Sequence, residues 1–437
     1  MFIETLIFSG DEGGYWIMER ASRLRGAGLL RENRLFRRLF LAASISSLGD
    51  WFNNIAVLSV ILQFTGSPAA VGLTLAMRVL PYLLVGPLGG VWSDRIRRTA
   101  IMISSDLARA VLALGFLLVT DAPRIWWAYL LTGLLVVFSA LYMPARSAYL
   151  TSIVEKQSLS RANGLLAGSN GLVMVVGFGL GGLVVAKFGP TAAFLLNSLS
   201  FLMSAWLLRP GALQEKKESV TPPDVGSFWR EFRTGVRAIG ENRPVALLFL
   251  LDIGWSIGGG AINVLISVMA YQVYDTGSSG MGMLYASLGS GTIAGSLIAG
   301  KWLHDQTGKM QTAAGVSFLL DAVSHILFAN SVSPCLGNLA LAGAGLAGAA
   351  GNAAIFSLIA MVTAHEVQGR VFSILHTAGS CVLALSMMAA GWLTVPFGPR
   401  LLGTVGGAVI LLFSIVYLIF QCFGPRVKNA RREFDAT

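Results

Sequence analysis

Charged residues are scarce in this chain. Lysine, arginine, aspartate and glutamate make up 12% of its 437 residues, whereas a soluble domain carries about 25%. Hydrophobic residues make up 54%, and the mean hydropathy is +0.68. A chain this apolar cannot keep a water-exposed surface hydrated. The composition therefore excludes an ordinary soluble protein and indicates that most of the surface faces lipid.

Cysteine is also rare, and residue patterns typical of enzymes are missing. Cys335, Cys381 and Cys422 have no ligand spacing, which favours small packing residues over a disulfide framework or a metal site. The sequence holds no H-E-x-x-H motif, nucleophile elbow or phosphate-binding loop in a suitable context. Two G-x-G-x-x-G matches, at 177–182 and 343–348, lie within apolar runs with no preceding strand and do not indicate a dinucleotide site. We therefore expect no enzyme, no bound cofactor and no metal.

Long apolar runs make up most of the chain. A helix needs roughly 20 apolar residues to cross a hydrocarbon core of about 30 Å. Twelve runs have a suitable length: 36–63, 68–92, 100–119, 125–149, 164–187, 190–208, 244–272, 281–302, 311–330, 334–362, 371–395 and 400–422. They are continuously apolar rather than alternating, which favours helices over barrel strands. The sequence predicts an all-α membrane protein with twelve transmembrane helices in two six-helix bundles.

The longest polar stretch, Pro210 to Arg243, divides the runs six and six. Within it Phe232, Val236 and Ile239 recur at helical spacing, which predicts an amphipathic helix at the inner membrane surface. The expected order is a cytosolic N-terminal segment 1–35, a six-helix bundle 36–209, a cytosolic linker 210–243, a second six-helix bundle 244–422 and a cytosolic tail 423–437.

Basic residues gather on one side of the predicted membrane. Most of the 32 lysines and arginines flank the runs on the side that holds both chain ends, and only Arg124, Lys187 and Arg400 lie on the other. This asymmetry predicts a multi-pass protein of the cytoplasmic (inner) membrane with both termini in the cytosol. It also explains the net charge of +10 by contact with anionic membrane lipids, so we expect no nucleic acid partner.

One turn between two of the runs has a distinctive pattern, Gly90-x-x-x-Asp94-Arg95-x-x-Arg98. It resembles the loop between spans two and three of major facilitator superfamily transporters, and the resemblance extends over roughly residues 35–422. The two halves also look related, because Gly300 lies 210 positions after Gly90. The resemblance implies two parallel six-helix repeats that open alternately on either side of the membrane.

Further residues are similar to the bacterial drug and siderophore exporter branch, which includes macrolide efflux and enterobactin exporters. They are Gly49, Asp50 and Trp51 in span one, Arg78 and Pro81 in span two, and Asp106 and Arg109 in span three. Phe178 departs from the pattern, because exporters commonly have proline there. The resemblance implies a monomer that uses protons to export an amphiphilic small molecule such as a drug, siderophore or lysolipid.

Three charged residues are the candidates for substrate binding and proton coupling: Asp50, Arg78 and Asp252. A charge within a span costs about 2.5–3.5 kcal/mol on insertion scales and marks a functional site by default. Asp50 and Arg78 lie near mid-depth in adjacent antiparallel spans and could pair. The pair could hold a proton-binding carboxylate, or could simply keep two helices in register. Asp252 lies in span seven, the repeat equivalent of span one.

Two further sets of residues follow from the resemblance. Aromatic and amide side chains expected to line the cavity are Trp51, Phe52, Tyr142, Asn170, Trp255, Asn263, Tyr285 and Asn352. Residues expected to close the cytosolic mouth are Gly90, Asp94, Arg95, Arg98, Asp106 and Arg109.

Other functions stay open at this point. They include a uniporter or a metal-ion exporter resembling ferroportin, and a lipid flippase or scramblase. Asp321 and His325, four residues apart in the ninth run, could form a locally satisfied pair or a metal or proton site.

Overall fold

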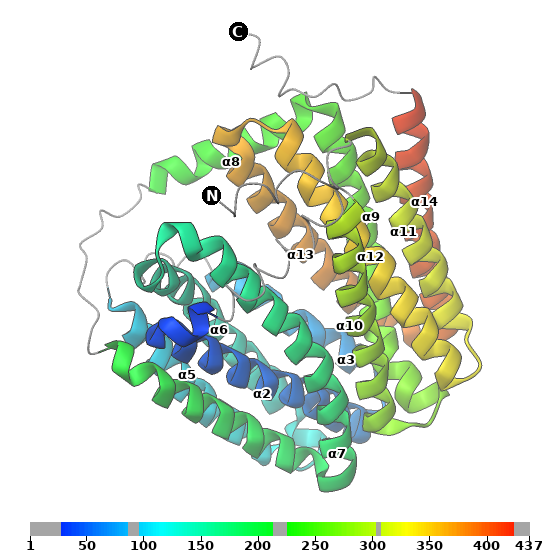
Figure 1. The fold of residues 1–437 in the computed structure, drawn as a ribbon. Coiled ribbons are helices and arrows are strands. Elements are labelled where there is room, and N and C mark those ends of the chain that lie inside the picture. Colours follow the sequence, from blue (N-terminus) through cyan, green and yellow to red (C-terminus); the bar gives the residue numbers. More distant parts are fainter. Residues whose placement is uncertain (1–27, 86–95, 213–224, 303–306, 424–437) are drawn as a thin grey trace, which may run out of the picture.

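The computed structural model describes residues 28–85, 96–212, 225–302 and 307–423, and within these ranges every regular element is a helix. The first half contains α2 (Arg34–Thr65), α3 (Pro68–Met77), α5 (Arg98–Gly115), α6 (Ile125–Ile153) and α7 (Leu159–Ala212). The second half contains α8 (Val225–Glu241), α9 (Arg243–Val268), α10 (Gly277–Trp302), α11 (Thr307–Asn330), α12 (Pro334–Val362), α13 (His365–Phe397) and α14 (Pro399–Phe423). Figure 1 shows the halves as two groups of helices inclined to one another.

Eleven helical segments of the described chain are long and apolar enough to cross a membrane. One of them, α7, has 54 residues, and at 1.5 Å per residue it would be about 81 Å long. Gly189 bends it sharply, because its φ of 79° and ψ of 169° are not helical and suit a residue without a side chain. The two arms, 159–188 and 190–212, are therefore separate crossings. This confirms the prediction of an all-α membrane fold with twelve transmembrane helices.

A repeated hydrogen-bond device shows that the halves share one plan. Asn33 caps α2, where its side-chain oxygen accepts from the Phe36 amide at 2.9 Å, and its Nδ2 donates to the Ile153 carbonyl at 2.7 Å. Asn242 caps α9 in the same way, and its Nδ2 donates to the Val362 carbonyl at 2.9 Å. Each asparagine thus ties the start of the first span of its half to the end of the fourth. We call this arrangement the asparagine brace.

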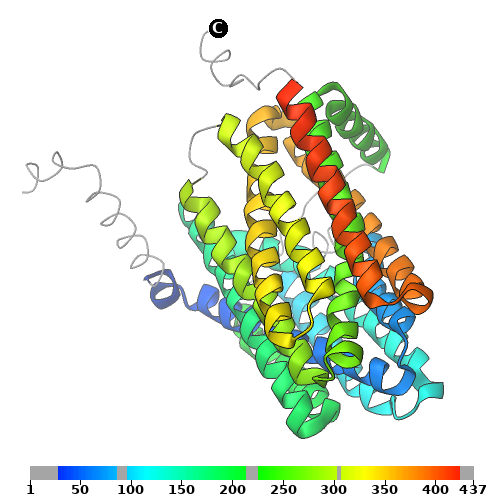
Figure 2. The same ribbon diagram turned by 90° about the vertical axis from the view of Figure 1, so that its right-hand side faces the viewer.

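In the second half α12 packs between α10 and α11, while α13 and α14 pack against α9. Figure 2 shows this half from the side, with α11 and α14 next to each other. The short helix α8 packs against α13 and α9, and its Ile239 is buried among their apolar side chains. Phe232 and Val236 of the same helix are exposed.

The two halves meet through two helix pairs, α7 with α10 and α3 with α13. Glycines permit the close approach. A Cβ added at Gly182 would lie 3.0 Å from the Gly282 Cα, and one added at Gly72 would lie 3.0 Å from the Gly391 Cα. The Gln272 side chain also donates to the Gly66 carbonyl across the halves at 2.8 Å.

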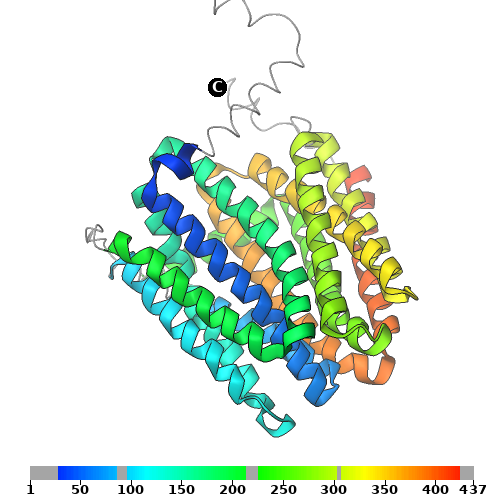
Figure 3. The same cartoon turned by 60° about the horizontal axis from the view of Figure 1, so that its bottom comes forward.

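These contacts lie at one end of the molecule, which we call the closed end. It contains the turn at Gly66, the bend at Gly189 and the start of α10. The opposite, open end contains the start of α2, the end of α6 and the start of α7. There, side chains added at Gly164 or Gly168 of α7 would meet no heavy atom within 4 Å. Figure 3 shows the first half from below, with α5, α2 and the second arm of α7 side by side.

Gly182→Val should separate the halves at the closed end. Its new Cβ would lie 2.7 Å from the Ser278 carbonyl oxygen, and backbone atoms cannot move aside as a flexible side chain can. We expect a longer distance between spin labels at Lys187 and Val332, which are exposed at that end on opposite halves. Gly164→Val, which has open space around it, is the control. An unchanged distance in Gly182→Val would contradict the packing described above.

Candidate functional site

A break in the second span positions Arg78. The helix α3 ends at Met77, residues 78–79 form a turn, and helical geometry resumes at Leu80. Pro81 explains the break, because it has no N–H to donate to the Met77 carbonyl four residues earlier. Arg78 therefore sits at an interruption inside a membrane span.

A cavity of about 260 Å³ lies inside the first half beside this break. Four residues singled out from the sequence line it together: Asp50 and Trp51 from α2, Arg78, and Asn170 from α7. Asn170 accepts a hydrogen bond from Ser47 at 3.2 Å. Thr132 and Ser139 of α6 form the opposite wall. The cavity is therefore polar on several sides although it lies at mid-depth in the bundle.

Asp50 pairs with an arginine other than the expected one. The Arg109 Nη1 atom lies 3.8 Å from the Asp50 Oδ2 atom. Asp50 and Arg78 are both described, yet no ion pair within 4.0 Å joins them. They line the same cavity without touching. The expected Asp50–Arg78 pair is thus absent from this conformation.

Arg109 is the centre of a buried charged cluster. It forms an ion pair with Asp106, whose other oxygen accepts from the Ser204 hydroxyl at 2.7 Å. The Tyr142 and Phe201 rings both lie against its guanidinium. The Arg109 Cζ atom is 4.8 Å from the centroid of the Tyr142 ring and 4.4 Å from that of the Phe201 ring. Asp106 and Arg109 are almost completely buried. Two carboxylates therefore share one guanidinium. The electrostatic attraction between these groups is stronger here than in water because the surroundings are apolar.

The residues expected at a cytosolic gate fall into two groups. Asp106 and Arg109 lie well within α5, in contact with the charged centre of the first half. Arg98 begins α5 and donates to the Ala148 carbonyl near the end of α6 at 3.2 Å. Gly90, Asp94 and Arg95 lie outside the described residues, so the gate remains a prediction.

An aromatic stack joins the two halves beneath the cavity. The Trp51 and Phe178 rings lie 4.5 Å apart, and Phe178 stacks on Tyr285 of α10 with a centroid distance of 4.5 Å and an angle of 11°. The Tyr285 hydroxyl donates to the Asn263 carbonyl at 3.2 Å. Phe178, which departs from the exporter pattern of proline, thus contacts the opposite half directly.

The other expected cavity residues lie around this core. Phe52 is buried against Gly181 of α7, and the buried Tyr142 hydroxyl has no hydrogen-bond partner among the described residues. Asn263 donates to the Gly259 carbonyl within α9 at 2.8 Å. Asn352 is half-buried on α12.

Asp252 and the remaining charged groups of the second half lie apart from Asp50. Asp252 faces Gly379 of α13, where an added Cβ would lie 2.9 Å from the Oδ2 atom. The Trp255 Nε1 donates to Asp321 at 3.0 Å, and His325 Nδ1 lies 3.4 Å from the same carboxylate. These three form a local buried cluster. Among the described residues, no group of three or more His, Cys, Asp or Glu side chains could hold a metal ion.

A second pocket of about 320 Å³ adjoins the first and shares Asn170 with it. It is lined by Arg146 and Leu150 of α6 and by Asn163 of α7. Arg146 lies within the apolar run 125–149 of the sequence. Its position in an apolar run was the signal that could have made it a candidate.

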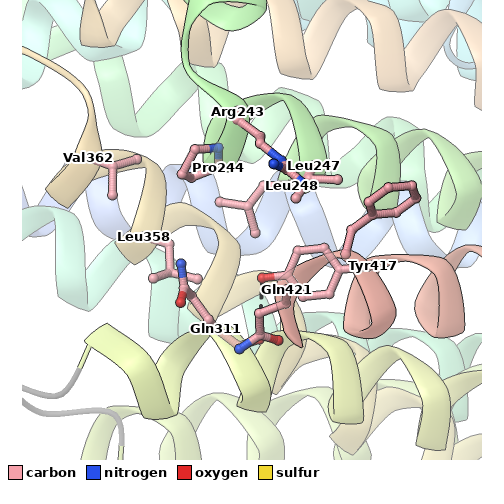
Figure 4. A pocket seen from close by; sticks show the side chains of 10 residues that line it. Arg243, Pro244, Leu247, Leu248, Gln311, Leu358, Val362, Tyr417 and Gln421 are labelled. Atoms are coloured by element: carbon pink, nitrogen blue, oxygen red, sulfur yellow. Dashed lines mark hydrogen bonds between the residues drawn. The ribbon is translucent and has the colours of Figure 1, made fainter. Parts of the chain in front are cut away.

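Not every hollow in the molecule is large enough for a ligand. Figure 4 shows a pocket between the start of α9 and the ends of α12 and α14, where Tyr417 donates to the Gln311 carbonyl at 3.3 Å. Its volume of about 40 Å³ has room for little more than water.

Arg109→Met should strongly destabilise the protein. The change leaves Asp106 buried without its cation, and breaking a buried pair costs about 3–5 kcal/mol. We expect a much lower thermal unfolding temperature in detergent. The double variant Asp106→Asn with Arg109→Met removes both charges and should recover part of the loss. Equal stability of the single variant and the unmodified protein would show that the pair is not needed.

Comparison with known proteins gives one consistent picture. The family model of the Major Facilitator Superfamily matches residues 39–342. The chain is 25% identical to the uncharacterized MFS-type transporter YfiS of Bacillus subtilis (strain 168), over 92% of this chain and 96% of that protein. It is 25% identical to BacE of Bacillus amyloliquefaciens, named as a bacilysin exporter, over 88% and 92%. It is 21% identical to macrolide efflux protein A of Streptococcus pyogenes, over 61% and 66%.

Solved structures share the fold. A bacterial homologue of the human lysosomal transporter Spinster, in an inward-facing and unoccupied conformation, matches with a TM-score of 0.68 and 15% identity, over 89% of this chain and 95% of that one. A POT family transporter in complex with a thioalcohol-conjugated peptide matches with a TM-score of 0.70 and 10% identity, over 89% and 96%.

Proposed function

Because the chain belongs to the Major Facilitator Superfamily, we propose that it is a secondary active transporter that exports an amphiphilic small molecule by alternating access. The single observation that carries the proposal is the polar cavity that holds Asp50, Arg78, Trp51 and Asn170 inside the first half. The same cavity also has aromatic and apolar lining, Trp51, Tyr82, Leu135 and Val136, and this combination suits an amphiphilic ligand. Two relatives named for export, BacE and macrolide efflux protein A, support the outward direction.

The distribution of basic residues supports an orientation. Among the described residues, the open end carries basic side chains at the start of α2 and around the start of α7, namely Arg34, Arg37, Arg38, Lys156 and Arg161. By the positive-inside rule this end would face the cytosol across a bacterial inner membrane. The described conformation is then open to the cytosol and closed at the outer face by the glycine contacts between α7 and α10. Substrate would enter from the cytosol or the inner leaflet.

Asp50 is the proposed proton-coupling residue. Its side chain is 37% exposed in the cavity while Arg109 remains almost completely buried. It can therefore exchange a proton with water, whereas Asp106 behind it cannot. Rearrangement of the 3.8 Å contact with Arg109 would link the charge of Asp50 to the conformation of the bundle. Asp252 in the second half is a further candidate, because it is partly exposed and contacts no cation within 4.0 Å among the described residues.

Asp50→Asn should abolish proton-driven transport while leaving the fold intact, because the amide fills the same space but cannot ionise. We would measure uptake of a panel of macrolides, siderophores and lysophospholipids into everted vesicles with an imposed pH gradient. The expected loss is about 100-fold or more, the scale on which one essential proton-transfer group acts. Substrate exchange without a gradient should persist.

Asp121→Asn is the matched control, because Asp121 lies half-exposed in a loop at the closed end and pairs only with Arg124. Asp252→Asn is tested in parallel. If both Asp50→Asn and Asp252→Asn keep full proton-driven flux, the coupling assignment is wrong. Lipid movement between leaflets without any gradient would instead favour a scramblase.

A further inference from the structure

Two arginines face the cavities of the first half, and neither has a close polar contact with the described part of the protein. Arg78 lines the 260 Å³ cavity, and Arg146 lines the 320 Å³ pocket that adjoins it. Neither makes a hydrogen bond or an ion pair within 4.0 Å to another described residue. A guanidinium is always charged and carries five N–H donors. Leaving two of them unpaired inside a membrane bundle is costly unless something else supplies the acceptors.

The acidic residues nearby do not satisfy them. Asp106 and Asp50 both lie against Arg109, so that guanidinium already faces two carboxylates. Counting the five charged groups of the cluster and its cavities, the arginines outnumber the aspartates by three to two. This group of five therefore has an excess positive charge, and the Arg78 and Arg146 side chains both line the cavities.

Other polar groups in the same cavity also lack partners. Asn53 and Thr132 are each 4% exposed and line the cavity. The Asn53 Oδ1 and Thr132 Oγ1 atoms have no hydrogen-bond partner among the described residues. Buried polar groups are normally satisfied, and an unexplained exception calls for a ligand or water. This observation is independent of the charges and indicates that the cavity is built to hold a polar ligand group.

The two pockets form a row along α6. Residues Thr132 and Ser139 line the cavity of Arg78, while Arg146 and Leu150 line the pocket nearer the C-terminal end of the same helix. That end lies at the open end of the molecule. A ligand entering there would meet Arg146 first and reach Arg78 afterwards, passing Asn170, which belongs to both pockets.

We infer that the transported molecule carries an anionic group, such as a carboxylate, sulfonate or phosphate, which binds Arg78 after entering past Arg146. The aromatic face of Trp51 in the same cavity suits an apolar or aromatic body attached to that group. The planar guanidinium of arginine binds such oxyanions with two parallel hydrogen bonds. The inference rests on the proposed transport function and specifies its substrate class: an amphiphilic anion rather than the cation that a lone carboxylate would select.

The experiment measures equilibrium binding, so it does not depend on transport. Purified full-length protein in phosphatidylcholine nanodiscs is titrated calorimetrically with 1-naphthylacetate, its neutral amide and 1-naphthylmethylamine, which share one apolar ring. We expect the anion to bind at least ten-fold more tightly than the amide, equivalent to about 1.4 kcal/mol. Equal binding of the three probes, or preference for the amine, would overturn the inference.

Variants assign the effect to the two arginines. Arg78→Gln and Arg146→Gln should each reduce the preference for the anion at least ten-fold, and Arg78→Lys should retain part of it because the charge remains. Arg124→Gln, a change in a loop at the closed end, should have no effect. Thermal unfolding is followed for each variant, and the Lys variant separates loss of charge from loss of fold. Unchanged selectivity in both Gln variants would overturn the inference.

A membrane lipid headgroup carries the same anionic chemistry as a soluble substrate. Repeating the titration in phosphatidylglycerol nanodiscs distinguishes the two. Unchanged naphthylacetate binding supports a small-molecule anion, whereas loss of binding shows that anionic lipid occupies the site and overturns the small-molecule assignment. If anion selectivity is found but no gradient drives flux in vesicles, the transport proposal fails while the binding site stands. If the gradient drives flux but the protein does not prefer the anion, the anion inference fails while the transport proposal stands.

Discussion

The ion pair between Arg109 and Asp106 is the interaction around which the first half is built. Neither group could remain in an apolar bundle alone, and each holds a different element in place. Asp106 binds Ser204 on the second arm of α7, while the Arg109 guanidinium lies over Tyr142 of α6 and Phe201 of α7 and reaches Asp50 of α2. Two side chains of α5 thus hold three other crossings, α2, α6 and the second arm of α7, to this helix. This cluster supports the wall of the cavity that lies in front of it.

Packing between the halves follows a different principle. The glycines of α7 and α10 bring two backbones into contact without any charge, and the stack of Phe178 on Tyr285 adds flat aromatic surface beside them. Contacts of this kind are not directional in the way that hydrogen bonds are, so they can separate and reform without leaving polar groups unsatisfied. The molecule therefore uses ion pairs to hold helices together within the first half. Between the halves it uses mainly apolar contacts, which can break and form again.

The fold could be predicted from the sequence because lipid imposes a strong rule: a crossing needs about 20 apolar residues and an internally bonded backbone. The bend at Gly189 was also visible as a short gap between two runs. The pairing of Asp50 was not predictable in the same way. It depends on which faces of α2 and α5 are turned toward each other. A helix that is apolar on all sides does not show from its sequence which side faces a neighbouring helix.

The depth of Arg109 in the bundle, by contrast, can be predicted from its position along the third run. Arg109 lies eleven positions after Arg98, about 16 Å along α5 from its first residue, and the i, i+3 spacing of Asp106 and Arg109 indicates a local pair. Their assignment to the cytosolic mouth came from resemblance rather than from this distance. Arg146 was likewise recognisable as a charge within a span, but only the structure shows that it faces a pocket.

The asparagine brace has a mechanical consequence. Asn33 and Asn242 tie the first and fourth crossings of their halves with the same geometry, so each half is secured as a unit. Both halves have this scaffold, and the cavity that contains Asp50 and Arg78 lies within the first half. A bound ligand would then stay at rest in the reference frame of one half. Seen from that half, the second half would swing about the bound ligand as the transporter switches.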